Sequence, residues 1–249
     1  MLRATTSADA GHSTALRRRP RLDPIKCVRG SNRHSAARPG DHALRADQPQ
    51  LQAILWDFGD TLVDERWMLA PLPGVPDWLA TYGGILGGCD LADRWNRGAA
   101  TASDVAEQLA RALGVSSHLI MGHMEACCRN IAYDPGVMDL IARLDLPQAI
   151  VTINPDIFTR VVVPTYGLQN RFEAIVTSWE EKTVSKADLC DIAMSRLTGA
   201  VDRGACLLVD NRMDNVLEWR GRGGVAWRFR HHRSLAARLS PLTIGRSGS

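Results

Sequence analysis

Short apolar segments alternate with segments of helical character through the second half of the chain. The apolar segments are typical of buried strands, and each is followed by residues that favour a helix start and an apolar stripe. The expected strands lie at 148–152, 174–177, 205–209 and 225–229, and the expected helices at 135–144, 157–166, 186–197 and 214–222. Because parallel neighbouring strands need a crossover, this order predicts an α/β fold whose parallel sheet is covered by helices.

An earlier strand is separated from this pattern by a long helical block. Residues 53–57 read A-I-L-W-D, so four apolar residues run into Asp57. Residues 66–133 are mainly helical in pattern, with Thr101 as a capping residue before one apolar stripe and Gly114 at its end. Because this block lies between the first strand and the others, we expect a helical domain inserted into an α/β core. The core would comprise 51–65 and 134–230.

The two ends of the chain differ in composition from the middle. Residues 1–50 hold 10 Lys or Arg and 4 Asp or Glu, with no Phe, Tyr or Trp. Such a segment cannot bury enough surface to offset its ordering entropy, so we predict that it is disordered. Its composition also fits an organelle transit peptide, or translated sequence upstream of the true start. Residues 231–249 contain no acid, and we expect a flexible basic tail there.

The composition disfavours several classes of protein. No apolar run approaches the roughly 20 residues that span a bilayer, and the N-terminus lacks the apolar core of a secretory signal. The six Cys form no C-x-x-C pair, which argues against a zinc site or a disulfide framework and favours reduced thiols in the cytoplasm. The net charge of +3 comes from the ends, since residues 51–249 carry −3. Basic ends without interleaved aromatic residues disfavour nucleic acid as a partner.

Four polar side chains stand where predicted strands end or predicted helices begin. They are Asp57, Thr152, Lys186 and Asp210. Each alone is commonly a turn former, a helix cap or a solvated side chain, but the carboxyl ends of parallel strands meet at one edge of a sheet. One Asp could attack phosphorus there and form an aspartyl-phosphate, while the hydroxyl and ammonium groups hold the phosphoryl oxygens. The second Asp would complete an oxygen-rich Mg²⁺ site.

In the order of these motifs the chain resembles the haloacid dehalogenase-like (HAD) superfamily of hydrolases. The resemblance rests on D-F-G-D-T at 57–61, A-I-V-T-I-N at 149–154, K-A-D-L at 186–189 and L-L-V-D-N at 207–211. It covers roughly residues 51–230 and extends to W-N-R-G-A-A-T-A-S-D-V-A-E-Q-L and Y-D-P-G-V-M-D-L-I, which look like the family's helical cap and cap-to-core junction. The resemblance implies a Rossmann-like core, with helices on both faces of the sheet, and a helical cap at 66–133 over the site.

The resemblance also implies a role for each matching residue. Asp57 would be the nucleophile, and Lys186 would restrain it and bind the phosphoryl group. Further contacts to the substrate would come from Thr152 and Asn154. Mg²⁺ would be bound by Asp57, the backbone carbonyl of Gly59 and Asp210. The expected substrate is a small phosphorylated metabolite, whose identity the sequence leaves open, as it does the oligomeric state.

Two positions depart from the family's pattern, and one lysine competes for a role. Phosphatases of this family usually carry an Asp two residues after the nucleophile, where it protonates the leaving group, but this chain has Gly59. A positioned acid contributes about 10²–10⁴-fold in rate. Asp60 is adjacent, yet neighbouring residues of an extended segment point to opposite sides. Asn211 replaces a second acid of the fourth motif, and Lys182 fits the lysine motif less well than Lys186.

Three functions therefore stay open. The chain could be a Mg²⁺-dependent phosphatase for good leaving groups such as acyl phosphates, or a 2-haloacid dehalogenase-type hydrolase whose halide leaves without a proton. It could also be a catalytically impaired member that binds a phosphorylated ligand or partner. Asp210 favours the phosphatase over the dehalogenase, because a metal-binding acid has no role in a metal-free displacement. We expect a small-molecule phosphatase.

Overall fold

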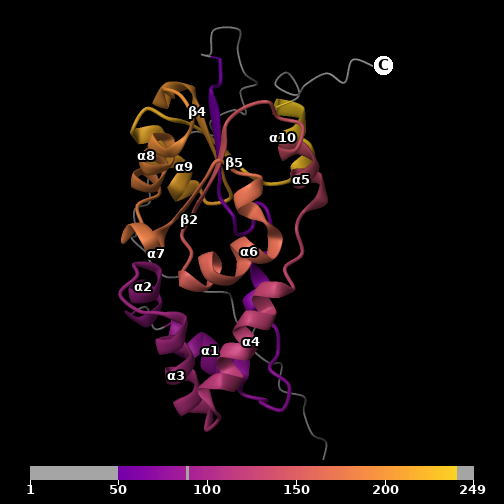
Figure 1. Cartoon of the computed structure of the whole chain (residues 1–249), viewed down its shortest axis with the longest axis vertical. Helices are drawn as coiled ribbons and strands as arrows, with labels where there is room; N and C mark the ends of the chain where they lie inside the picture. Colours follow the sequence, from indigo (N-terminus) through magenta and orange to yellow (C-terminus); the bar gives the residue numbers. More distant parts are fainter. Residues whose placement is uncertain (1–49, 88–89, 240–249) are drawn as a thin grey trace, which may run out of the picture.

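Five parallel strands form one sheet at the centre of the molecule (Figure 1). The computed structural model describes residues 50–87 and 90–239, so the disorder predicted for residues 1–50 falls, apart from residue 50, outside the described residues. The strand order is β3-β2-β1-β4-β5. The strands are β1 Ala53–Trp56, β2 Gln148–Thr152, β3 Ala174–Thr177, β4 Cys206–Asp210 and β5 Val225–Arg228. The order reverses at β1, which is where open α/β sheets form a crevice beyond the strand ends.

Both faces of the sheet are covered, as the apolar strand sequences predict. Side chains of β1 alternate between two cores: Ile54 and Trp56 belong to one, and Ala53 and Leu55 belong to the other. Helices α8 (Lys186–Arg196) and α9 (Met213–Gly221) supply the second core, while α5 (Pro135–Ile141) and the segment before α6 (Val163–Tyr166) supply the first. Figure 1 shows these two groups of helices on opposite sides of the strands. The predicted α/β class is confirmed.

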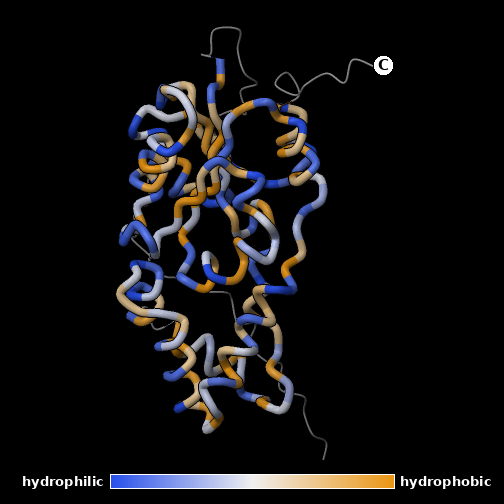
Figure 2. The backbone as a smooth tube through the Cα atoms, viewed as in Figure 1, coloured by the Kyte–Doolittle hydropathy of each residue, from blue (hydrophilic) through white to orange (hydrophobic). Residues whose placement is uncertain are grey.

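The block between β1 and β2 is helical and lies beyond the carboxyl ends of the strands (Figure 1). It begins with the 3₁₀-helix η1, Glu65–Leu69. Four helices follow: α1 Trp78–Gly87, α2 Asp90–Asn96, α3 Ala102–Leu113 and α4 Ser117–Arg129. Hydrophobic residues are concentrated along the strands, whereas hydrophobic and hydrophilic residues alternate along these helices (Figure 2). The buried residues of this block belong to the same hydrophobic cluster as one face of the sheet.

Local signals in the sequence explain where several helices begin and end. Thr101 and Asp104 form a reciprocal capping box at the start of α3, and Gly114 ends that helix with a φ of 67°. Asp134 caps α5, whose first residue is Pro135. The helix expected at 157–166 is partly a wide π turn, Phe158–Val162, followed by α6. A short helix, α7 (Ser178–Glu181), follows β3 directly.

The flexible tail predicted at 231–249 is wrong for residues 232–239, and residues 240–249 lie outside the part of the chain that the structure describes. Residues His232–Leu239 form helix α10, which packs against α5. Leu235 and Leu239 lie four residues apart on one side of this helix and are buried in the core. His232 Nδ1 lies 3.3 Å from Asp134 Oδ2 and ties the helix start to the cap of α5. None of the described helices has both the length and the apolar character needed to cross a membrane.

Candidate active site

Asp57 stands at the point where β1 leaves the sheet. Its backbone N–H donates to the Val209 carbonyl at 2.9 Å, which continues the ladder between β1 and β4 by one residue. The chain then turns sharply, since the N–H of Leu62 donates back to the Phe58 carbonyl at 2.9 Å. Asp57 is only 7% exposed, so protein atoms surround most of its carboxylate.

Lys186 binds three oxygen atoms around this carboxylate. Its ammonium lies 2.8 Å from Asp57 Oδ1, 3.1 Å from Asp210 Oδ2 and 2.9 Å from the Val151 carbonyl oxygen. The ammonium carries three protons, so each of these oxygens can accept one. Lys186 is fully buried, and the three predicted residues Asp57, Lys186 and Asp210 form one cluster.

The start of α8 places this lysine. Ser185 caps the helix by accepting the Asp188 N–H at 3.1 Å. The Glu218 carboxylate, from α9, accepts the Ser185 hydroxyl at 2.6 Å and the Lys186 N–H at 3.2 Å. A carboxylate at a helix N-terminus is stabilised by the unpaired N–H groups there. Two helices therefore fix the backbone from which the Lys186 side chain extends inward.

Burial and charge act against each other in this cluster. Burial alone would lower the pKa of Lys186, but Asp57 and Asp210 hold that pKa above its usual range, so the ammonium stays charged. Burial raises the pKa of Asp57 to about 6; Lys186 opposes this shift, and the negative charge of Asp210 adds to it. Two carboxylates against one ammonium leave an excess of negative charge at the strand ends.

Asp210 is fully buried and held by three donors. Oδ1 accepts the Arg212 N–H at 2.7 Å, and Oδ2 accepts Asn215 Nδ2 at 2.9 Å in addition to Lys186. These contacts fix the carboxylate at the end of β4, beside Asp57. Asn211, which replaces the second acid of the fourth motif, accepts Arg228 Nε through its backbone carbonyl at 3.0 Å.

Thr152 and Asn154 form a pair at the end of β2. Asn154 Nδ2 donates to Thr152 Oγ1 at 2.7 Å, and Thr152 is buried. β2 is the neighbour of β1, and the Val151 carbonyl that binds Lys186 precedes Thr152 directly. Thr152 therefore ends the strand next to the cluster, and Asn154 is held by Thr152 two residues further along the chain.

Lys182, the competing lysine, lies elsewhere. It is exposed, and its ammonium donates to the Gly98 carbonyl at 3.2 Å and sits 4.2 Å from the centre of the Trp179 ring. Trp179 Nε1 in turn donates to the Ala100 carbonyl at 2.8 Å. Lys182 thus helps to attach the helical block to the core, and Lys186 alone of the two contacts Asp57.

The loop after Asp57 brings an acid that the sequence did not single out. Glu65 is the first residue of η1, and its backbone N–H donates to Asp60 Oδ1 at 3.0 Å. A Cβ atom added to Gly59 would lie 3.1 Å from Glu65 Cδ and Oε1, so the Glu65 carboxyl lies beside the place where a side chain at position 59 would begin. Seven residues of irregular loop lie between Asp57 and Glu65, and no periodic pattern predicts the approach of Glu65 to Gly59.

The neighbourhood of the Glu65 carboxyl changes its acidity. Although the residue as a whole is exposed, protein atoms crowd its carboxyl group. This burial, together with the negative charges of Asp60 and Asp57, raises the pKa of Glu65 to about 7, although Arg212 and Lys186 oppose the shift. The loop therefore presents a carboxyl group that shares an electrostatic environment with the cluster.

The donors at the strand ends fit a hard divalent cation. Mg²⁺ uses one or two carboxylates and completes its shell with water and phosphate oxygens. Asp57 and Asp210 supply two carboxylates with excess negative charge, and Gly59 supplies a backbone carbonyl on the same loop. In the described part of the chain, no three or more His, Cys, Asp or Glu side chains gather into a metal cluster.

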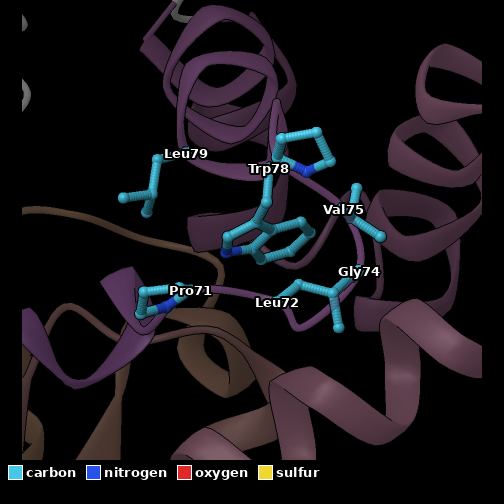
Figure 3. A pocket seen from close by; sticks show the side chains of 7 residues that line it. Pro71, Leu72, Gly74, Val75, Trp78 and Leu79 are labelled. Carbon is cyan, nitrogen blue, oxygen red and sulfur yellow. The ribbon is translucent and has the colours of Figure 1, made fainter.

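A separate apolar pocket lies within the helical block. It has a volume of about 310 Å³ and is lined by Pro71, Leu72, Gly74, Val75, Pro76, Trp78 and Leu79. Figure 3 shows the Trp78 ring in the middle of these side chains. None of them belongs to the carboxylate cluster, so the hollow is not a continuation of the candidate site. Trp78 itself is buried and packs against Tyr82 and His123.

Comparison with known proteins identifies the fold. No family model and no curated protein matches the sequence. Among solved structures, a predicted HAD-like hydrolase from Porphyromonas gingivalis is 14% identical, with a TM-score of 0.62 over 77% of this chain and 98% of that one. A HAD-family enzyme from Bacteroides thetaiotaomicron, in complex with magnesium and inorganic phosphate, is 14% identical, with a TM-score of 0.53 over 72% and 94%.

A third structure represents the dehalogenase branch. The L-2-haloacid dehalogenase from Xanthobacter autotrophicus, with chloropropionic acid covalently bound, is 18% identical and has a TM-score of 0.56 over 80% of this chain and 85% of that one. At such identities the likeness concerns the fold. The HAD-like fold expected from the motifs is confirmed, and the chemistry must be argued from the residues themselves.

Proposed function

We propose that this chain is a HAD-like hydrolase that removes phosphoryl groups from small molecules with the help of Mg²⁺. The observation that carries the proposal is the buried Lys186 ammonium, 2.8 Å from Asp57 and 3.1 Å from Asp210, at the ends of β1 and β4. A fixed cation beside a carboxylate both orients that carboxylate and offers positive charge to an incoming phosphoryl group.

In the first step, a carboxylate oxygen of Asp57 attacks phosphorus, and the bond from phosphorus to the leaving-group oxygen breaks. Lys186 holds Asp57 through Oδ1, which leaves Oδ2 as the attacking atom. Thr152 and Asn154, at the end of β2, would donate to the phosphoryl oxygens as charge develops on them. In the second step, water attacks the aspartyl-phosphate and releases inorganic phosphate.

Mg²⁺ would be held by Asp57, Asp210 and the Gly59 carbonyl, and when bound it would neutralise charge on the phosphoryl oxygens. The bound magnesium and phosphate of the B. thetaiotaomicron enzyme support this assignment by likeness of fold. The excess of carboxylate charge over Lys186 supports it from this chain's own residues.

The test is turnover by the full chain of 4-nitrophenyl phosphate and acetyl phosphate, with Mg²⁺ and after its removal by EDTA. We expect Mg²⁺-dependent phosphate release that Asp57→Asn abolishes, because an amide cannot form the aspartyl-phosphate. Asp77→Asn, which changes an exposed acid before α1, is the matched control and should leave the rate unchanged. Equal phosphate release by wild type and Asp57→Asn would overturn the proposal.

A dehalogenase is the second candidate, and Gly59 is the observation that favours it. Displacement of halide from carbon by Asp57 needs no acid at that position, because a halide leaves without a proton. Chloride release from 2-chloropropionate in EDTA, abolished by Asp57→Asn, would establish this activity. Binding of inorganic phosphate with no turnover of any of these substrates would instead favour the impaired, ligand-binding alternative.

A further inference from the structure

We propose that Glu65 supplies the acid–base group that position 59 lacks. In this role its carboxyl protonates the leaving-group oxygen in the first step and takes a proton from the attacking water in the second. The inference rests on the proposed phosphatase function and assigns the proton transfers of that reaction to a residue outside the four motifs.

Geometry is the first argument. An acid at position 59 would begin at a Cβ atom, and that atom would lie 3.1 Å from both Cδ and Oε1 of Glu65. The φ of Gly59 does not lie in the left-handed region, so the backbone there does not require glycine. The Glu65 carboxyl therefore occupies space that an Asp side chain at position 59 would need. With glycine at that position the Glu65 carboxyl can stay where it is, whereas a larger residue would require it to shift.

The loop between the two residues is the second argument. Asp60 has a φ of 51°, unusual for a residue other than glycine, and its carboxylate accepts the Glu65 N–H at 3.0 Å. Asp64 caps η1 from the other side by accepting the Arg66 N–H at 3.0 Å. Asp60 is thus a positioning residue that holds Glu65, and its carboxylate is committed to the loop rather than directed at the substrate.

The proton balance of the reaction closes with Glu65 alone. As Asp57 attacks phosphorus and the P–O bond breaks, the leaving oxygen takes the Glu65 proton and departs as an alcohol. In the second step water attacks phosphorus, its proton passes to the Glu65 carboxylate, and the Asp57–phosphorus bond breaks. Phosphate, the Asp57 carboxylate and protonated Glu65 are then regenerated.

The first test compares substrates whose leaving groups differ in their need for a proton. Glu65→Gln keeps the size of the side chain and removes the acid. The quantity to compare is kcat/KM, which reports the first step and excludes the water step that both substrates share. On an alkyl phosphate we expect kcat/KM to fall about 10²–10⁴-fold, the contribution typical of a positioned acid. On acetyl phosphate the fall should be much smaller, because the leaving acetate is stable without a proton. Glu107→Gln, an exposed glutamate on α3, is the matched control and should change neither rate.

The second test moves the acid to position 59. We expect Glu65→Ala to lose alkyl phosphatase activity. Adding Gly59→Asp to Glu65→Ala should raise the activity at least tenfold above that of Glu65→Ala alone. In Gly59→Asp alone the new side chain meets the Glu65 carboxyl, so its gain should be smaller than in the double variant. The rescue also separates loss of the acid from damage to the fold.

An equal fall of Glu65→Gln on both substrates, or no fall on the alkyl phosphate, would overturn the role of Glu65 while leaving the phosphatase intact. If Gly59→Asp does not raise the activity of Glu65→Ala, the role of Glu65 is likewise overturned while the phosphatase stands. Turnover that survives Asp57→Asn would instead overturn the phosphatase, and the role of Glu65 with it.

Discussion

Lys186 decides the charge balance at the carboxyl ends of β1 and β4. A buried ammonium is costly unless it is paired and hydrogen-bonded, and here it reaches two carboxylates and the Val151 carbonyl. The arrangement makes the carboxylates depend on the lysine as much as the lysine depends on them. A single substitution would leave Asp57 and Asp210 facing each other without a cation.

Replacing Lys186 with methionine should therefore cost stability as well as activity. We expect a loss of about 3–5 kcal/mol in the free energy of unfolding of the metal-free protein at pH 7.5, measured by urea denaturation. The pKa of Asp57 is raised from 3.8 to about 6, so its contribution to stability is present at low pH and is lost as the pH rises through 6. Without Lys186 the pKa of Asp57 would rise further, so the ionised carboxylate would cost more stability at high pH. The destabilisation caused by Lys186→Met should therefore be smaller at pH 5 than at pH 7.5.

Lys182→Met is the matched control, because this lysine is exposed and its contacts are a hydrogen bond to Gly98 and the Trp179 ring. It should change the free energy of unfolding by less than about 1 kcal/mol. A Lys186→Met protein as stable as the control at both pH values would contradict the charge balance described here.

The site residues on strands and helices could be predicted from the sequence, whereas the one in a loop could not. Asp57, Lys186 and Asp210 follow strands or begin a helix, so periodicity places them at one edge of a parallel sheet, and the structure brings them into contact. Glu65 lies in a loop, and its approach to Gly59 depends on the turn that Asp60 makes. No spacing rule describes such a turn, and for this reason the sequence raised the question of Gly59 without suggesting Glu65.

The bounds of a helix or strand can be predicted closely where they depend on residues that are neighbours in the sequence. The strands expected at 148–152 and 174–177 have the observed bounds, because short apolar runs between turn residues define buried strands well. Helix α10 was missed because its basic composition suggested a solvated tail, whereas two leucines four residues apart are enough to bury one side of it. A hydrophobic stripe of two residues is too short to outweigh composition before the partner helix α5 is known.

The start of α3 offers a test at the scale of one element. Thr101 Oγ1 accepts the Asp104 N–H at 3.3 Å, and Asp104 Oδ2 accepts the Thr101 N–H at 2.8 Å. Thr101→Ala removes the first of these bonds and should lower the free energy of unfolding by about 1 kcal/mol in urea denaturation. Ser103→Ala, exposed within the same helix turn, should be neutral or slightly stabilising, since alanine is the better helix former. Equal effects of the two changes would contradict the capping role.

At the scale of the whole molecule, buried polar contacts join the α/β core to the helical block. Asp156, which follows β2, is 2% exposed, and its Oδ1 accepts Trp95 Nε1 at 2.7 Å and the Ala102 N–H at 2.9 Å. Gly98 lies in the same junction and has a φ of 66°. A Cβ atom at this position would lie only 2.3 Å from the Trp179 carbonyl oxygen, so no larger residue fits without a shift. These contacts hold the segment between α2 and α3 against the carboxyl ends of the strands, near the candidate site.

Asp156→Ala should loosen this junction. The change leaves the Trp95 and Ala102 N–H groups buried without an acceptor, and we expect the free energy of unfolding to fall by about 2–4 kcal/mol in urea denaturation. Asp156→Asn keeps an acceptor oxygen and should lose less. Limited proteolysis should cut Asp156→Ala faster than wild type at residues 97–101, because that segment loses its anchor. Asp139→Ala, an exposed acid on α5, is the matched control; a loss no larger than its own, with unchanged proteolysis, would show that Asp156 does not join the two parts.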